Sequence, residues 1–516
     1  MAARLFDPAG SVALMVGARL LNLAVGLVGL PVLIRYLGGE AFAAWALLLA
    51  LAGGFSLLEL GMTLAVVRFL AVPAQQGRWT QARELLGRAW LVLAGSFGLG
   101  ALAVLALARP LADWLGLPAA GGVPAHQAIL GVFAAVALRA FLQSGTWTLI
   151  AARRFGAVSA VSVLQPLAAN IAAMLAAWCW GRLDAALLAF WGAQLAVVGA
   201  VFLLQRRRCA PRFGAATWNR QALGELLHYG LANQAEGWAQ FVNFQFDKFL
   251  IAAWVGLWGV APYEVANRAV AALRSIPASG ADTFLPNAMV RADGARAAWD
   301  WYLASTRLAA YGVVVFLLAP LAVAPVFLYA WTGEMGHLGS DVFVALCIGT
   351  VASVLALPAA TLAQAQGRPA LQARAAGLAV ALNLPLSLLL VLRFGALGAA
   401  IGSACAMALS AALLVWTVHR HFGQPLAPTL AVLARFWPVV LVCALWGVAG
   451  AWIFDAWFET LPPQAPYARA LRVAPGLCAV GAYVLCIACV AAVELARGAF
   501  TAGELAWLRA CFTRRR

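Results

Sequence analysis

Twelve ionisable side chains lie within segments of the chain that are otherwise apolar enough to sit in lipid. They are Arg19, Glu59, Arg68, Arg139, Glu236, Asp247, Lys248, Glu264, Arg268, Arg274, Asp282 and Arg307. A charge near the centre of a membrane costs about 2.5 to 3.5 kcal/mol on insertion scales, so these groups are expected to face a shared, water-filled interior. Seven are basic and five are acidic, and this positive excess predicts a transport cavity that takes an anion.

The segment 228–254 carries the most regular polar pattern. Polar residues recur in it at steps of three or four: Asn233, Glu236, Gln240, Asn243 and Asp247. This spacing places them on one face of a helix, and a polar stripe on an apolar helix points into a bundle or a cavity. Hydrogen bonding between packed helices is the alternative interpretation, but two carboxylates and several amides exceed what that role usually needs.

The next segment, 261–285, continues the pattern. Glu264 and Arg268 stand four residues apart and can pair, and Arg274 lies too deep for its side chain to reach the membrane surface. The charges near cytoplasmic helix ends, which can reach that surface, are Arg68, Asp282 and Arg307. The side chains that we assign to substrate binding in the cavity are Arg19, Arg139, Asn243, Lys248, Arg268, Arg274 and Arg307.

The composition places these charges in a polytopic membrane protein. Of 516 residues, 64% are hydrophobic and 10% are charged, with a mean hydropathy of +0.89, whereas soluble proteins carry about 25% charged residues. Apolar stretches long enough to span a bilayer recur along the chain, so we predict an all-α fold with about fourteen transmembrane helices. The predicted spans are 11–34, 43–70, 89–108, 127–150, 157–179, 185–205, 228–254, 261–285, 302–329, 341–362, 371–391, 397–418, 434–454 and 470–493.

Basic residues are distributed unevenly between the predicted loops. With both termini in the cytoplasm, 22 of the 35 basic residues fall on the cytoplasmic side and 6 on the far side. This asymmetry follows the positive-inside rule and predicts a multi-pass protein of the bacterial inner membrane. The net charge of +16 is therefore assigned to membrane topology, with membrane lipids as partners and no nucleic acid.

A short repeat indicates how the spans are grouped. Tyr36–Gly38 and Trp254–Gly256 correspond at a shift of 218 residues, and each ends one span and leads into the next. We predict two six-helix bundles, related as parallel repeats about the membrane normal, around a central cavity, with two additional C-terminal helices. The predicted domain bounds are 11–205, 228–418 and 434–493.

Several short motifs point to one family. They are LIRYLGGEAF at 33–42, LELGM at 58–62, DKFLI at 247–251 with VAPY at 260–263, and FGALGAAI at 394–401. Together they resemble bacterial polysaccharide flippases of the multidrug/oligosaccharidyl-lipid/polysaccharide exporter superfamily. The second motif more often contains Asp in that family, and Glu59 keeps the carboxylate here.

The resemblance implies a substrate built from a polyprenyl tail, a pyrophosphate and an oligosaccharide, with polysaccharide polymerase and glycosyltransferases as further partners. Arginine suits a phosphate because its planar fork donates two hydrogen bonds. The resemblance also implies coupling to H⁺ or Na⁺, for which a carboxylate in a dry cavity is suited. The ion-coupling candidates are Glu59, Glu236, Asp247 and Glu264. We favour Glu236 and Glu59, because the other two have basic neighbours in the sequence.

Three alternatives remain open. A drug/cation antiporter of the same superfamily is disfavoured by the basic excess, and a peptidoglycan-precursor flippase would share both fold and anionic substrate. A membrane polysaccharide polymerase or ligase would be expected to carry a large external catalytic loop. The chain has no Walker A sequence, no H-E-x-x-H and no cysteine–histidine cluster, so we expect no enzymatic activity, no metal site and no cofactor.

Overall fold

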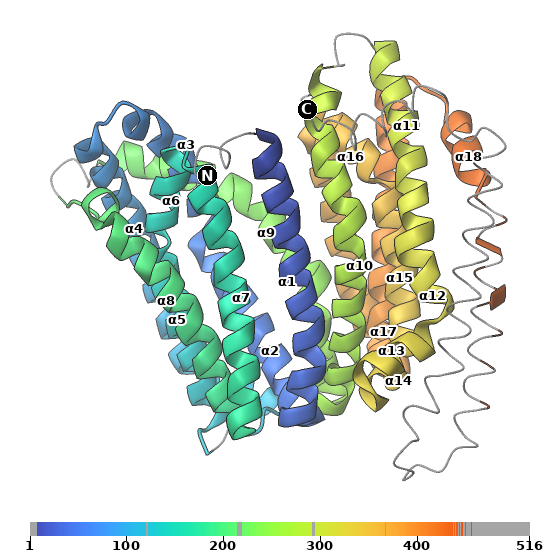
Figure 1. The fold of residues 1–516 in the computed structure, drawn as a ribbon, viewed down its shortest axis with the longest axis horizontal. Coiled ribbons are helices and arrows are strands. Elements are labelled where there is room, and N and C mark those ends of the chain that lie inside the picture. The colour runs from blue at the N-terminus through green and yellow to red at the C-terminus, as the bar shows by residue number, and fades with distance from the viewer. Residues whose placement is uncertain are drawn as a thin grey trace. The chain divides into compact units, whose positions relative to one another are not determined.

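The computed structural model describes residues 8–436 apart from 120–121, 214–218, 291–294 and 367, together with nine single positions between 438 and 456. This part of the chain is built from helices and contains no strand (Figure 1). The all-α fold predicted from the composition is confirmed.

The chain forms two compact units. The first runs to Ala272 and includes Ala373–Ala406, and the second contains Leu273–Gln372 and resumes at Met407. Two helices, α10 (Leu257–Val290) and α17 (Pro369–His421), contribute to both units. The other helices of the first unit are α1 (Pro8–Leu37), α2 (Gly39–Ser56), the 3₁₀ turn η2 (Leu57–Glu59), α3 (Met62–Gln75), α4 (Trp79–Trp114), α5 (Ala125–Leu142), α6 (Ser144–Ala151), α7 (Phe155–Trp180), α8 (Leu183–Cys209) and α9 (Arg220–Trp254).

The second unit contains shorter helical pieces. They are α11 (Ala295–Val313), the π-helical turn η5 (Val314–Leu318), α12 (Ala319–Ala322), α13 (Ala324–Thr332), α14 (Glu334–Leu338), α15 (Ser340–Leu355), α16 (Leu357–Ala365) and α18 (Ala427–Ala434). Within this unit α11 packs against α15, α16 and α18.

Small residues hold the first unit together. In α7 the buried positions are Ala169, Ala173, Ala176 and Ala177, whose spacing places them on one face of the helix. This helix packs against α1 and α8. Alanine faces let helix backbones approach closely, which is how helices associate in a membrane where lipid tails offer no hydrophobic contrast.

Eight helices or joined helix pairs in the described chain are long and apolar enough to cross a membrane. With the recurrent apolar composition, they establish a multi-pass membrane protein. The count of fourteen stays a prediction, and the predicted spans 434–454 and 470–493 lie largely or wholly outside the described residues. One of the eight is the 52-residue stretch Ala370–His421, where Gly395 has non-helical backbone angles (φ 58°, ψ −136°) between two predicted spans.

The predicted span 43–70 is broken in its middle. After η2, Leu60 and Gly61 both adopt left-handed backbone angles, with φ of 50° and 67°, and α3 then starts at Met62. This conformation costs about 1 to 2 kcal/mol per residue for residues other than glycine. Non-helical backbone at membrane depth is tolerated where it is buried in protein or lines a cavity, so this break marks a position to examine for a site.

The break lies directly against the backbone of α9. A methyl group added at Gly61 would collide with the carbonyl of Gly230, and one added at Gly230 would collide with the carbonyl of Leu60. Neither glycine has space for a side chain, because the two backbones touch. This contact fixes the broken helix to α9.

Substitution of Gly61 by alanine is therefore expected to destabilise the protein by roughly 3 kcal/mol, from the left-handed backbone and the forced separation of two backbones. Gly77 is the matched control, because its φ is 70° but nothing lies within 4 Å of an added methyl group. Thermal unfolding of the purified variants in detergent would measure the difference. Equal losses at the two positions would show that backbone angle alone matters and that the contact with Gly230 does not.

In the two compact units α9 and the middle of α17 group with the N-terminal helices, and the predicted domain bounds stay a prediction. The local repeat has a structural counterpart: Gly38 and Gly256, which are 218 residues apart, both have positive φ, at 85° and 99°. Each glycine separates two long helices. The larger repeat of six helices stays a prediction.

Candidate functional site

A cavity of about 490 Å³ lies inside the first unit, at the break between α2 and α3. Its walls come from α2, η2, α3, α5 and α9. The lining residues are Gly53, Ser56, Leu57, Glu59, Gly61, Thr63, Leu64, Arg139, Gln234, Gly237, Phe241, Phe244 and Gln245. The cavity therefore combines one carboxylate, one guanidinium, two amides and two aromatic rings.

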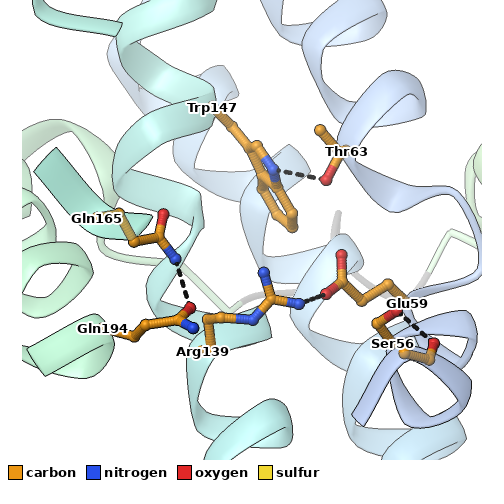
Figure 2. A network of polar contacts seen from close by, with 8 residues as sticks. Ser56, Glu59, Thr63, Arg139, Trp147, Gln165 and Gln194 are labelled. Atoms are coloured by element: carbon orange, nitrogen blue, oxygen red, sulfur yellow. Dashed lines mark hydrogen bonds and ion pairs between the residues drawn. The ribbon is translucent and has the colours of Figure 1, made fainter. Parts of the chain in front are cut away.

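Two of the predicted site residues meet in this cavity. Arg139 Nη2 of α5 donates to Glu59 Oε1 of η2 at 2.8 Å, and their side chains are only 19% and 14% exposed. Figure 2 shows the guanidinium reaching across to the carboxylate. The two residues are 80 positions apart, so only the packing of α5 against the helix break pairs them. Removing either charge would leave the other one poorly solvated.

Buried side chains hold the helices around this ion pair. Trp147 of α6 is fully buried, and its indole N–H donates to the Thr63 hydroxyl of α3 at 3.1 Å. On the neighbouring helices, the amide of Gln165 in α7 donates to that of Gln194 in α8 at 3.0 Å. Both contacts appear around Arg139 in Figure 2. The first contact joins α6 to α3, which lines the cavity, and the second joins α7 to α8 behind Arg139.

The face of α9 toward the cavity lies about 100°, or one residue, away from the predicted polar stripe. Its lining residues are Gln234, Gly237, Phe241, Phe244 and Gln245. Of the predicted stripe, Asn243 is half-buried but does not line the cavity, and Asp247 is buried elsewhere in the unit. The side chains of Asn233, Glu236 and Gln240 lie outside the described residues.

Glycines in α2 make room for an aromatic wall. Cβ atoms built at Gly53 and Gly54 would lie 3.8 and 3.1 Å from the ring of Phe241. The ring therefore packs close to the α2 backbone while lining the cavity. Aromatic faces of this kind suit the apolar faces of sugar rings as well as hydrocarbon.

Asp247 belongs to a separate buried cluster in the same unit. It is 1% exposed, and its Oδ2 accepts a hydrogen bond from the Tyr263 hydroxyl of α10 at 2.7 Å. The Ser403 hydroxyl of α17 contacts the same oxygen. Among the described residues, the other carboxylate oxygen, Oδ1, has no hydrogen-bond partner.

The cluster contains more hydrogen-bond acceptor oxygens than hydroxyl hydrogens that can be donated to them. Ser403 Oγ also lies 3.0 Å from Asn383 Oδ1, and Ser387 Oγ lies 2.7 Å from that amide oxygen and 3.3 Å from the Ala399 carbonyl. Each serine hydroxyl carries one hydrogen but has two acceptors within reach. A buried carboxylate, an amide oxygen, a carbonyl and hydroxyls are ligands that a hard cation prefers.

A second buried group links this region to the cavity wall. Lys248 is 3% exposed, and its ammonium lies 2.6 Å from Glu264 Oε2 and donates to Gln245 Oε1 at 2.8 Å. Arg268 Nε lies 2.6 Å from the other oxygen of Glu264. The structure thus brings together three predicted site residues of α9 and α10, and Gln245 connects them to the cavity.

Replacing Lys248 by methionine is expected to lower the free energy of unfolding by about 3 to 5 kcal/mol, because it breaks a buried ion pair and removes one partner of Glu264. The double variant with Glu264→Gln should recover part of the loss. The control is Arg182→Gln, which breaks an exposed pair with Asp184 at 2.7 Å and should cost less than about 1 kcal/mol. Thermal unfolding in detergent gives all three values, and equal costs at the two pairs would contradict the expectation.

The remaining predicted residues lie elsewhere. Arg274 and Arg307 belong to the second unit and are half-buried there, while the side chain of Arg19 lies outside the described residues. Arg68, which we expected to be able to reach the membrane surface, is exposed and lies 4.4 Å from the ring centre of Tyr229. The side chain of Asp282 also lies outside the described residues.

Sequence reasoning missed several residues of these sites. They are Thr63, Gln234, Phe241, Gln245, Tyr263, Asn383, Ser387 and Ser403. The i, i+4 spacing of Asn383 and Ser387 on an apolar helix was a usable signal of a polar face. In the described part of the chain, no three His, Cys, Asp or Glu residues gather as a metal site.

Comparison with known proteins places this geometry in a family. The profile of a family described as polysaccharide biosynthesis protein matches residues 9–286, which is more than half of the chain and includes the whole cavity. The chain belongs to this polysaccharide biosynthesis protein family. The membership confirms the resemblance drawn from the short motifs. No curated protein matches the sequence.

Solved structures share the fold of this family member at low sequence identity. A lipid II flippase MurJ in an inward closed conformation is 11% identical, with a TM-score of 0.63 over 92% of this chain and 97% of that one. An inward-facing multidrug resistance MATE family transporter of the MOP superfamily is 13% identical, with a TM-score of 0.61 over 80% of this chain and 98% of that one. An outward-facing transporter with the same description is 15% identical, with a TM-score of 0.53 over 81% and 96%. The chain has the fold of these transporters.

Proposed function

We propose that this protein flips a polyprenyl-pyrophosphate-linked oligosaccharide from the cytoplasmic to the periplasmic face of the bacterial inner membrane by alternating access. One observation carries the proposal: a member of a polysaccharide biosynthesis family has a transporter fold with a guanidinium lining a cavity of its first unit. The reaction needs no covalent chemistry, so the protein acts as a transporter and not as an enzyme. Both termini lie in the cytoplasm in this proposal.

Arg139 is the proposed phosphate contact. Its Nη2 donates to Glu59 Oε1 at 2.8 Å, while its Nε is buried without a hydrogen-bond partner among the described residues, and a phosphate can accept from both nitrogens of the guanidinium. The exchange keeps the guanidinium paired and releases the Glu59 carboxylate, which then has to be hydrated or protonated in the loaded cavity. Phe241 and Phe244 offer surfaces for the sugars nearest the phosphate.

The coupling ion is proposed to bind at Asp247. Glu59, favoured from the sequence, is committed to Arg139, and Glu264 is held between two cations. Asp247 instead has an oxygen without a hydrogen-bond partner among the described residues and lies among other oxygen ligands from α17. Sodium or a proton would supply the positive charge that this cluster lacks.

A route connects the two sites. Asp247 and Lys248 are neighbours on α9, and they contact Tyr263 and Glu264, which are neighbours on α10. Lys248 in turn donates to Gln245 on the cavity wall. A shift of α10 on ion binding would therefore move a residue that faces the substrate.

Glycosyltransferases are the proposed suppliers of the substrate, and a polysaccharide polymerase is the proposed consumer on the far side.

The second candidate function is an antiporter of organic cations, favoured by the fold shared with MATE transporters. A cation would pair with Glu59 and release Arg139, as a phosphate would pair with Arg139 and release Glu59, so the membership of a polysaccharide biosynthesis family is what favours the first proposal. A peptidoglycan-precursor flippase remains a possible variant of the first proposal, since its substrate carries the same pyrophosphate.

The test uses the full chain in liposomes loaded with a fluorescent polyprenyl-pyrophosphate oligosaccharide. The rate at which an external quencher gains or loses access to the label reports flipping. Protein-dependent exchange of this lipid supports the proposal, and exchange restricted to a labelled peptidoglycan precursor assigns the other glycan. Proton-driven movement of an organic cation without lipid exchange would overturn it in favour of the antiporter.

A further inference from the structure

One end of the first unit carries a dense cluster of arginines that the transport cavity does not use. We define the arginine cluster as Arg78, Arg83, Arg88, Arg153, Arg154, Arg206, Arg207, Arg208 and Arg212. These residues come from the turn before α4 and the start of α4, from the turn between α6 and α7, and from the end of α8 and the residues that follow it. The same three segments, residues 75–88, 151–155 and 205–213, contain a single acidic residue, Glu84.

Specific contacts fold two of these segments together. Arg83 Nε of α4 donates to the carbonyl of Ala210 at 2.9 Å, and the backbone N–H of Arg212 donates to the carbonyl of Arg83 at 2.9 Å. The guanidinium of Arg208 lies 5.0 Å from the ring centre of Trp79. The chain after α8 is thus fixed to the first turns of α4, although 127 residues separate Arg83 from Ala210.

Most of the guanidinium groups face outward. Arg78, Arg153, Arg154, Arg206, Arg207 and Arg212 are exposed. Arginines placed only to set membrane topology need no fixed arrangement, since topology depends on their number in each loop. Here, the arginines at the start of α4 and at the end of α8 are held close to one another by fixed contacts, at a cost in repulsion that one carboxylate cannot offset.

The turn before α7 gives a second indication that arginine side chains are needed at this end of the unit. Arg153 has a φ of 56°, and the N–H groups of Arg153 and Arg154 close the end of α6 by bonding back to Ile150 and Leu149. Glycine is the residue usually found at such a left-handed helix end. An arginine there is strained, so its presence is explained by the side chain and not by the backbone.

We propose that the arginine cluster binds the phosphodiester headgroups of anionic phospholipids in the membrane leaflet that surrounds this end of the unit. Arginine forks match phosphate oxygens in geometry and charge. Trp79 stands at the start of α4, where an aromatic ring suits the headgroup level. Clusters of four to eight basic residues beside a transmembrane helix attract anionic lipid in general. In this protein, the contacts between α4 and the end of α8 also hold part of the arginine cluster in a defined arrangement.

Native mass spectrometry of the full chain, released from micelles that contain phosphatidylglycerol and phosphatidylcholine, tests the proposal. The wild-type protein is expected to retain phosphatidylglycerol preferentially, and Arg207→Gln/Arg208→Gln should weaken that binding at least tenfold. The control is Arg420→Gln/Arg435→Gln, which removes the same charge from two exposed arginines of the second unit. Arg420 also lies over a tryptophan, 5.3 Å from the ring centre of Trp416, so the control matches in chemistry and should bind within twofold of wild type.

A second variant guards against a folding defect. Arg153→Gln/Arg154→Gln removes two exposed arginines whose backbone N–H groups bond to Ile150 and Leu149 of their own turn, and it should weaken phosphatidylglycerol binding about as much. Equal losses in the control and cluster variants, or equal retention of the two lipids by wild type, would overturn the proposal. Displacement of the lipid by millimolar inorganic phosphate would assign the cluster to a soluble phosphate instead.

Discussion

Replacing Arg139 by glutamine is expected to slow the flipping of a pyrophosphate-linked oligosaccharide about 10- to 100-fold. Hydrogen bonds to a charged group contribute about 1.5 to 3 kcal/mol, and each 1.4 kcal/mol corresponds to a factor of ten in rate. Arg139 is the cation that lines the described cavity, and its pairing with Glu59 at 2.8 Å shows that an oxyanion can reach this guanidinium. The quencher-access assay in liposomes measures the rate.

Three further variants separate charge, geometry and folding at this position. Arg139→Lys keeps the charge but not the fork, so its rate should fall between wild type and Arg139→Gln. Glu59→Gln/Arg139→Gln removes both buried charges, which restores the stability that a single unpaired carboxylate would lose, and should remain slow. Arg109→Gln, at an exposed position of α4, should flip at the wild-type rate. A folded Arg139→Gln protein with a rate within twofold of wild type would exclude Arg139 as the phosphate contact.

Asp247→Asn is expected to abolish the response of flipping to an imposed sodium or proton gradient, with more than a tenfold loss of the gradient-driven component. The substitution keeps the shape of the side chain and an oxygen for Tyr263, which donates at 2.7 Å, but removes the charge that a cation needs. A hard cation binds oxygen ligands whose negative charge sets its affinity. Flipping is measured in the same liposomes with a sodium gradient, a proton gradient or neither.

The control for Asp247 is Asp184→Asn, which alters a carboxylate paired with an exposed arginine at the start of α8. Ser403→Ala removes one neutral ligand of the cluster and should weaken the gradient response only in part. A sodium response that survives in Asp247→Asn would place the ion elsewhere, and loss of the response in both aspartate variants would indicate a general effect of charge. Dependence on one gradient alone identifies the coupling ion.

The membrane-embedded helical fold was predictable because burial in lipid leaves few choices. A chain with 64% hydrophobic residues and recurrent 20-residue apolar stretches must satisfy its backbone internally, and helices do so within each segment. The broken span at 57–61 was not predictable in this way. Its left-handed residues are stabilised by contact with Gly230 on α9, and that contact exists only after the helices pack.

The polar stripe of α9 shows the limit of helical periodicity. Spacing identified residues that share a face, but not the direction in which that face points. Packing directs toward the cavity a face of α9 that is offset by one residue from the predicted stripe. Gln245 and Phe241 therefore line the cavity, while Asp247 joins the α17 cluster. Rotation of a helix about its axis depends on which neighbours fill its grooves, and no local pattern contains that information.

By itself the sequence determined that this is a multi-pass helical membrane protein with charges in its spans, because the cost of a charge in lipid makes such residues conspicuous. It also carried the short motifs of the polysaccharide biosynthesis family. Only the tertiary structure decided which charges pair: Glu59 with Arg139, and Lys248 and Arg268 with Glu264. The physical reason is range, since an ion pair forms over about 4 Å, while the residues of the first pair are 80 positions apart along the chain.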